Sequence, residues 1–133
     1  MIIKKVTYTD YMENERTEEL RFNLSEAELT EMELTTTGGL GEYIKKITAA
    51  QDAPAMIALF KDLVLKSYGE VSPDGRRFIK NDKIREEFSQ TPAYSKIFME
   101  LAFDADAAAN FIKGVIPKDM ADKLPADLSK VTN

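Results

Sequence analysis

Carboxylates are the most frequent reactive side chains in the first part of the chain. Two facing carboxylates can hydrolyse a glycosidic bond, one as an acid and one as a base. Here the acids between Asp10 and Glu33 alternate with apolar residues or lie in the polar run DYMENERTEE. The pattern gives no sign that any of these carboxylates is buried. It therefore favours a solvated surface over a catalytic pair.

Two other stretches resemble ligand loops without completing one. TTTGGLGEYIKK places glycines before a helix, where N–H groups can meet a phosphate, but the GxxxxGK[ST] order is absent. Asp104 and Asp106 lack the third acid, the glycine and the terminal glutamate of a calcium loop. We expect a helix connector and a helix cap instead, and no catalytic, cofactor-binding or metal-binding residues.

Basic side chains gather near the middle of the chain. They form a candidate docking patch for an acidic protein, or for RNA and phosphate with Phe78 nearby: Arg76, Arg77, Lys80, Lys83 and Arg85. Interspersed carboxylates dilute the positive charge, which favours the protein partner over nucleic acid.

The composition narrows the function classes. The 133 residues contain no histidine and no cysteine, so the commonest general base and metal ligand is missing. A net charge of -5 disfavours a nucleic-acid binder. These features predict a protein that is not an enzyme, needs no cofactor and binds other proteins.

No apolar run approaches the roughly 20 residues that a membrane span needs. The start MIIKKVTYTD lacks the apolar core of a signal peptide. We therefore expect a soluble intracellular protein without membrane contact.

Period-two patterning predicts an N-terminal β-hairpin. Ile2, Lys4, Val6 and Tyr8 share one strand face, and the run around Leu20 to Leu24 alternates in the same way. Asn14 offers a turn residue between the two runs.

Helix signals follow the hairpin. Ser25 and Glu28 form a capping-box pattern, a second short helix is expected over 42–50, and Asp52 caps a longer one. Thr91 caps the last helical segment, which continues to about residue 113. Asp104 can act as a second cap within it, so the segment is either one bent helix or two short ones. Between them, 72–75 reads as a turn that lets 68–71 pair with 76–79.

Together these elements predict an α+β fold that is mainly α-helical. The N-terminal β-hairpin packs on a small helical bundle, and a second short hairpin is an option near 70–79. We expect a single domain over 1–120 and a mobile C-terminal tail over 121–133.

Three segments carry a family resemblance: AAQDAP at 49–54, LKSYGEVSPDGRRF at 65–78 and FSQTPAYSKIFMELA at 88–102. From about Val6 to Met120 the chain resembles the tail assembly chaperones of long non-contractile-tailed, siphovirus-type bacteriophages. The resemblance implies a host-cytoplasmic assembly factor, absent from the mature virion, that binds the tape measure protein and helps the major tail tube protein polymerise around it. It also implies a frameshift-extended form, and homo-oligomerisation stays open.

Such a chaperone needs an exposed apolar face for a helical client. The expected client surface lies on the helices 52–66 and 92–113, with these candidate contacts: Met56, Leu59, Phe60, Leu63, Tyr94, Phe98, Met99 and Phe103. The same periodicity also describes an ordinary core. The alternatives are a permanent head–tail joining or tail-terminating protein of the virion and, less favoured, a small nucleic-acid-binding regulator.

Overall fold

The computed structural model describes residues 1–116 and places ten elements along them. They are β1 (Ile2–Thr9), β2 (Glu15–Phe22), α1 (Glu26–Thr35), α2 (Leu40–Ala49), α3 (Ala53–Ser67), β3 (Tyr68–Val71), β4 (Phe78–Ile79), α4 (Asp82–Ser89), α5 (Pro92–Phe103) and α6 (Ala105–Val115). The predicted α+β, mainly helical fold is confirmed. The proposed tail 121–133 lies outside the described residues.

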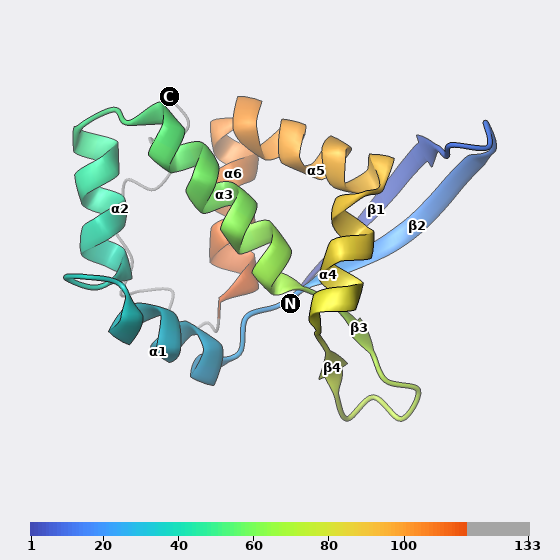
Figure 1. Cartoon of the computed structure of the whole chain (residues 1–133), viewed down its shortest axis with the longest axis horizontal. Coiled ribbons are helices and arrows are strands. Elements are labelled where there is room, and N and C mark those ends of the chain that lie inside the picture. Colours follow the sequence, from blue (N-terminus) through green and yellow to red (C-terminus); the bar gives the residue numbers. More distant parts are fainter. Residues whose placement is uncertain (117–133) are drawn as a thin grey trace.

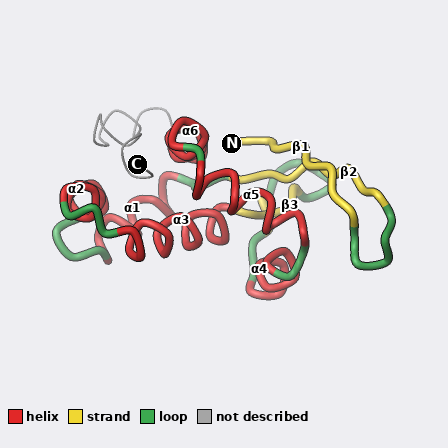
Figure 2. Tube along the Cα trace, turned by 90° about the horizontal axis from the view of Figure 1, so that it is seen from above, coloured by secondary structure: helices red, strands yellow, loops and turns green. Residues whose placement is uncertain are grey.

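The four strands form one antiparallel sheet in the order β1-β2-β3-β4. The predicted N-terminal hairpin is present, with a register that runs from Ile2 opposite Phe22 to Thr9 opposite Glu15. The second hairpin is present too, because Glu70 pairs with Ile79 and Val71 with Phe78. In both views the tip of the β1–β2 hairpin projects away from α1 and α2 (Figures 1 and 2).

The hairpin buries the face that its period-two pattern predicts. Val6, Tyr8, Leu20 and Phe22 are buried, while Ile3 on the opposite face is half exposed. This alternation fixes the register, because a slip by one residue would turn the apolar set toward water.

Asp10, rather than Asn14 alone, organises the turn at the hairpin tip. Its carboxylate accepts the N–H groups of Met12 and Asn14, each at 2.9 Å, and the Nε of Arg16 at 2.5 Å. The Arg16 bond is the main reason that the pKa of Asp10 lies below its ordinary value. The Asp10 side chain therefore adds three bonds to the two backbone hydrogen bonds that close the turn, Asp10 N–H to the Asn14 carbonyl and Glu13 N–H to the Asp10 carbonyl.

Most helices begin directly after a residue whose side chain caps them. The Ser25 and Glu28 capping box is complete, and Asp52, Asn81, Thr91 and Asp104 each accept an N–H in the first turn that follows. Asp104 separates α5 from α6, so the structure has two helices there rather than one bent helix.

The second helix begins earlier than the sequence suggests, at Leu40 instead of Glu42. Gly39 precedes it with φ at 90°, a conformation that favours glycine. The Glu33 carboxylate accepts a hydrogen bond from the Leu40 N–H at 2.7 Å, so this N–H, which has no partner within the helix, is paired. Because a side chain of α1 makes this cap, residues near Leu40 alone could not reveal it.

The core centres on Phe22, which has no exposed surface. The centroid of its ring lies 5.3 Å from the ring centroid of Phe111, 5.7 Å from that of Tyr68 and 5.9 Å from that of Phe88. Tyr68 and Phe88 stack at 3.8 Å. One apolar cluster thus joins the hairpin to helices from the middle and the end of the described chain.

Gly69 lets β4 pack closely against β3. A Cβ added there would lie 2.8 Å from the Phe78 ring and 2.9 Å from the Ile79 carbonyl oxygen. We predict that Gly69→Ala lowers the free energy of unfolding by about 1–3 kcal/mol, because backbone must shift. Urea titration measures this, with Glu70→Ala, an exposed change in the same strand, as the control; equal losses for both variants would contradict the packing argument.

Candidate functional site

The exposed apolar face of α5 is the strongest candidate site on a helix. Met99 is 50% exposed and Phe103 is 80% exposed, and the spacing of four residues puts them on one side of the helix. Exposed large apolar side chains grouped on one face mark surfaces that bind other molecules. We call Met99 and Phe103 the α5 apolar face.

Tyr94 connects this helix to the core, and Phe98 lies beside Tyr94. Both are half-buried, and their rings lie 6.1 Å apart. The Tyr94 ring also meets Phe88 edge-on at 5.5 Å. These contacts pack the first half of α5 against α4 and the core.

The candidate client residues of α3 lie elsewhere. Met56, Leu59, Phe60 and Leu63 are all buried, the most exposed of them at 7%. In this conformation they are core residues, and the exposed members of the candidate set, Met99 and Phe103, are on α5.

The three most exposed large apolar residues within residues 1–116 were not predicted as site residues. Tyr11 and Met12 stand at the hairpin tip and Leu34 lies near the end of α1, all equally exposed. The sequence did contain a sign of this exposure: Tyr11 and Met12 are large apolar residues in an otherwise polar loop, where they have no core to pack into.

The five residues of the predicted basic patch lie in two kinds of environment. Lys80 Nζ donates to the Asn23 carbonyl at 2.6 Å and to both oxygens of Glu28, and Arg85 Nε donates to the Leu65 carbonyl at 3.1 Å. These two side chains tie β4 and α4 to the body of the fold. Arg76, Arg77 and Lys83 are exposed.

The bond between Lys80 and Glu28 predicts an acid-sensitive contribution to stability. Burial raises the pKa of Glu28, but bonds from Lys80 and the Ser25 N–H outweigh it, so the pKa falls below its ordinary 4.5. A carboxyl with a lowered folded pKa stabilises the fold above its unfolded pKa, and this contribution disappears as the pH falls through the folded pKa.

We therefore predict that Lys80→Met costs about 1 kcal/mol at pH 7, a modest figure because the Glu28 side chain is 40% exposed. The difference from wild type should shrink at a pH below the folded pKa of Glu28. Urea unfolding at both pH values measures it, with Lys83→Met as the exposed control. A deficit that is unchanged in acid would contradict the role of Glu28.

Metal and phosphate chemistry find no support in the described part of the chain. Residues 1–116 contain no group of three acidic side chains placed to hold a metal ion. The glycine-rich connector at 38–41 leads into a helix start that Glu33 already occupies. Asp104 accepts the Ala107 N–H, which is the cap expected from the sequence.

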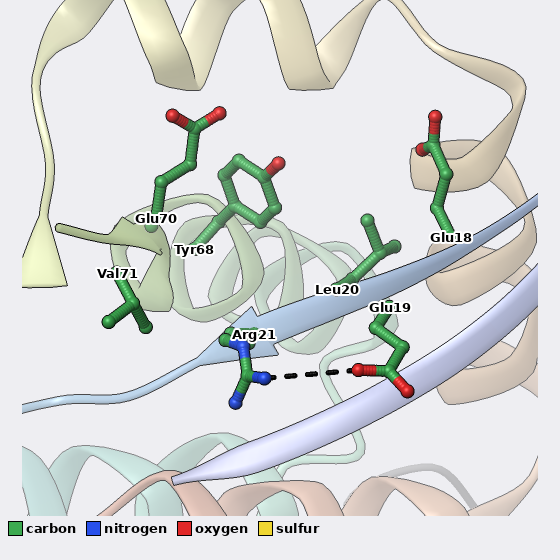
Figure 3. Close-up of a pocket in the computed structure, with 8 residues that line it drawn as sticks. Glu18, Glu19, Leu20, Arg21, Tyr68, Glu70 and Val71 are labelled. Carbon is green, nitrogen blue, oxygen red and sulfur yellow. Dashed lines mark ion pairs between the residues drawn. The ribbon is translucent and has the colours of Figure 1, made fainter. Parts of the chain in front are cut away.

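A cleft of about 470 Å³ lies where β2 and β3 separate. Figure 3 shows its lining, in which Tyr68, Glu70, Glu18 and Leu20 extend to one side of the strands while Arg21, Glu19 and Val71 extend to the other. Its polar walls and exposed backbone suit an extended chain better than a compact ligand.

Comparison with known families decides what kind of protein carries these surfaces. The phage tail assembly chaperone family matches residues 1–131, nearly the whole chain. The chain belongs to this family. A tail assembly chaperone acts during assembly and interacts with tail proteins, which indicates a non-enzymatic role.

Two other comparisons add nothing to this assignment, because no curated protein and no solved structure matches the chaperone. None of the helices in residues 1–116 combines the length and the apolar content that a membrane crossing requires. The match over residues 1–131 confirms the family resemblance that was inferred from the three sequence segments.

Proposed function

We propose that this tail assembly chaperone binds the tape measure protein, keeps it soluble and promotes polymerisation of the tail tube around it, without catalysing a reaction. The observation that carries the proposal is the α5 apolar face, in a chain that belongs to the chaperone family. Binding would bury Met99 and Phe103 against an apolar stripe of a client helix.

The chemistry of the surface supports a transient partnership. Two large apolar side chains give a small contact, and small contacts are typical of weak or short-lived complexes. The net charge of -5 keeps the unoccupied chaperone from associating with itself non-specifically. The half-buried Tyr94 and Phe98 would border the contact.

Co-expression tests the proposal. The tape measure protein alone should be largely insoluble, and the chaperone should raise its soluble fraction and purify with it. An unrelated acidic protein of similar size is the control. Unchanged solubility together with the absence of a complex would overturn the proposal.

Further expectations concern the assembly partners. We infer contacts with the major tail tube protein and with a frameshift-extended form of the chaperone. Within the basic patch, Arg76, Arg77 and Lys83 are the exposed candidates for docking an acidic partner. We also infer that the chaperone acts in the host cytoplasm and leaves before the virion matures. Mass spectrometry of purified virions tests this, because a permanent tail component would be found in them.

A further inference from the structure

Three hydrogen bonds determine which residues of β2 point toward β1. Asp10 N donates to the Asn14 carbonyl at 2.9 Å, which continues the β1–β2 ladder by one residue pair. Asn23 N, directly after β2, donates in the opposite direction, to the Ser67 carbonyl at 2.8 Å. The Thr7 carbonyl faces away from β2, because it accepts a bond from Lys96 Nζ. In an antiparallel ladder the N–H and C=O of one residue share a side, and successive residues alternate.

The alternation leaves part of β2 without a strand partner. Even-numbered residues of β2 bond to β1, so Thr17, Glu19 and Arg21 direct their backbone groups toward β3. Of these, only Arg21 has a partner there, because β2 pairs with β3 through Arg21 opposite Gly69 and Phe22 opposite Tyr68 alone. Within residues 1–116 the backbone groups of Thr17 and Glu19 form no hydrogen bond across this edge. We call this stretch the open β2 edge.

The cleft beside the open β2 edge has an acidic lining. Three glutamates and one arginine line it, which gives a net charge of -2: Glu18, Glu19, Glu70 and Arg21. The Arg21 guanidinium lies 3.8 Å from the Glu19 carboxylate. The ion pair between the Glu18 carboxylate and the Arg16 guanidinium is long, at 4.0 Å. Glu70 forms no ion pair with any described residue.

Glu18, Glu70 and the Tyr68 hydroxyl lie on the same side of the strands (Figure 3). Burial, followed by the charges of Glu70 and Glu18, raises the pKa of Tyr68, so its hydroxyl stays protonated and available for hydrogen bonding. Side chains of an added strand would alternate between the two sides. Every second one would therefore meet these two carboxylates.

We propose that the open β2 edge binds an extended segment of a partner protein that carries lysine or arginine at alternate positions. The segment would add as a short strand, taking its main-chain hydrogen bonds from Thr17 and Glu19 and placing its cations beside Glu18 and Glu70. This surface is distinct from the α5 apolar face and would contact an extended chain rather than a helix.

A labelled peptide tests the charge requirement. The probe is a fluorescein-labelled hexapeptide of alternating threonine and lysine, and its matched control alternates threonine and glutamate. Fluorescence anisotropy should show salt-sensitive binding of the first peptide only. Equal binding of both peptides, or binding of neither, would overturn the proposal. Combining Glu18→Gln with Glu70→Gln should weaken binding about fivefold, as expected for two partly exposed ion pairs.

Proline at position 19 tests the backbone requirement. Glu19→Pro removes the N–H that points away from β1, so the β1–β2 ladder keeps its bonds. Binding should be lost in Glu19→Pro and retained within about threefold in Glu19→Ala, which keeps the N–H. Circular dichroism verifies folding of both variants. In wild type, the peptide should slow amide exchange at Thr17 and Glu19, and unchanged exchange would contradict strand addition.

The remaining outcomes also discriminate. Concentration-dependent dimerisation that Glu19→Pro abolishes would assign the open β2 edge to a second copy of the chain and overturn the peptide proposal. Met99→Ser with Phe103→Ser should leave peptide binding unchanged. Failure of strand addition and failure of client binding can therefore be told apart.

Discussion

Replacing Phe22 with alanine should lower the free energy of unfolding by about 3–5 kcal/mol, a large share of the roughly 5–15 kcal/mol that stabilises a typical domain. Phe22 is fully buried and its ring meets Tyr68, Phe88 and Phe111, which come from three other elements. Removing the ring leaves a cavity that neighbours on separate helices and a strand cannot close together. Urea denaturation followed by circular dichroism measures the loss.

Phe103→Ala is the matched control, since it removes the same side chain from an exposed position. Its free energy of unfolding should change by less than about 0.5 kcal/mol. A comparable loss in the two variants would mean that Phe103 packs in the fold and is not free for a client. A small loss in Phe22→Ala would show that the aromatic cluster is not the centre of the core.

Combining Met99→Ser with Phe103→Ser should abolish the rise in tape measure solubility and leave the free chaperone folded. Large apolar side chains at the centre of an interface cost about 2 kcal/mol or more each when truncated, which is roughly thirtyfold in affinity. Neither side chain is buried in the free chaperone, so its free energy of unfolding should stay nearly constant. The soluble fraction of the co-expressed client and the yield of the complex are the measurements.

Met12→Ser and Leu34→Ser provide the controls for this double variant. Both side chains are as exposed as Phe103, but they lie at the hairpin tip and on α1. Each should retain client binding. If either one removes it and the α5 variant does not, the client site lies on that element and the assignment to α5 is wrong.

Local chemistry made the elements predictable from the sequence. The alternation of Val6 and Tyr8 with polar residues fixed the hairpin face, because side chains of a strand alternate sides. Ser25, Asp52 and Thr91 located helix starts, since a short polar side chain before a helix can accept its free N–H groups. The turn at 72–75 likewise followed from proline and glycine positions.

Burial was not predictable in the same way. The helical periodicity of Leu59 and Leu63 is equivalent to that of Met99 and Phe103, yet the first two are buried and the last two are exposed. Periodicity states only that residues share a face. Which face is covered depends on the neighbours that tertiary packing brings, such as α5 against α3 and β1.

The sequence by itself determined the family, the hairpin, the caps at Ser25, Asp52 and Thr91, and the absence of histidine and cysteine chemistry, because each depends on residue types or short spacings. Only the tertiary structure decided that Lys80 binds Glu28, that Glu33 caps α2 and that β3 leaves β2 after Gly69. The first two features each join a residue of α1 to one outside that helix, and the third depends on where a strand bends. Their energies arise from contacts that exist only once the chain has folded.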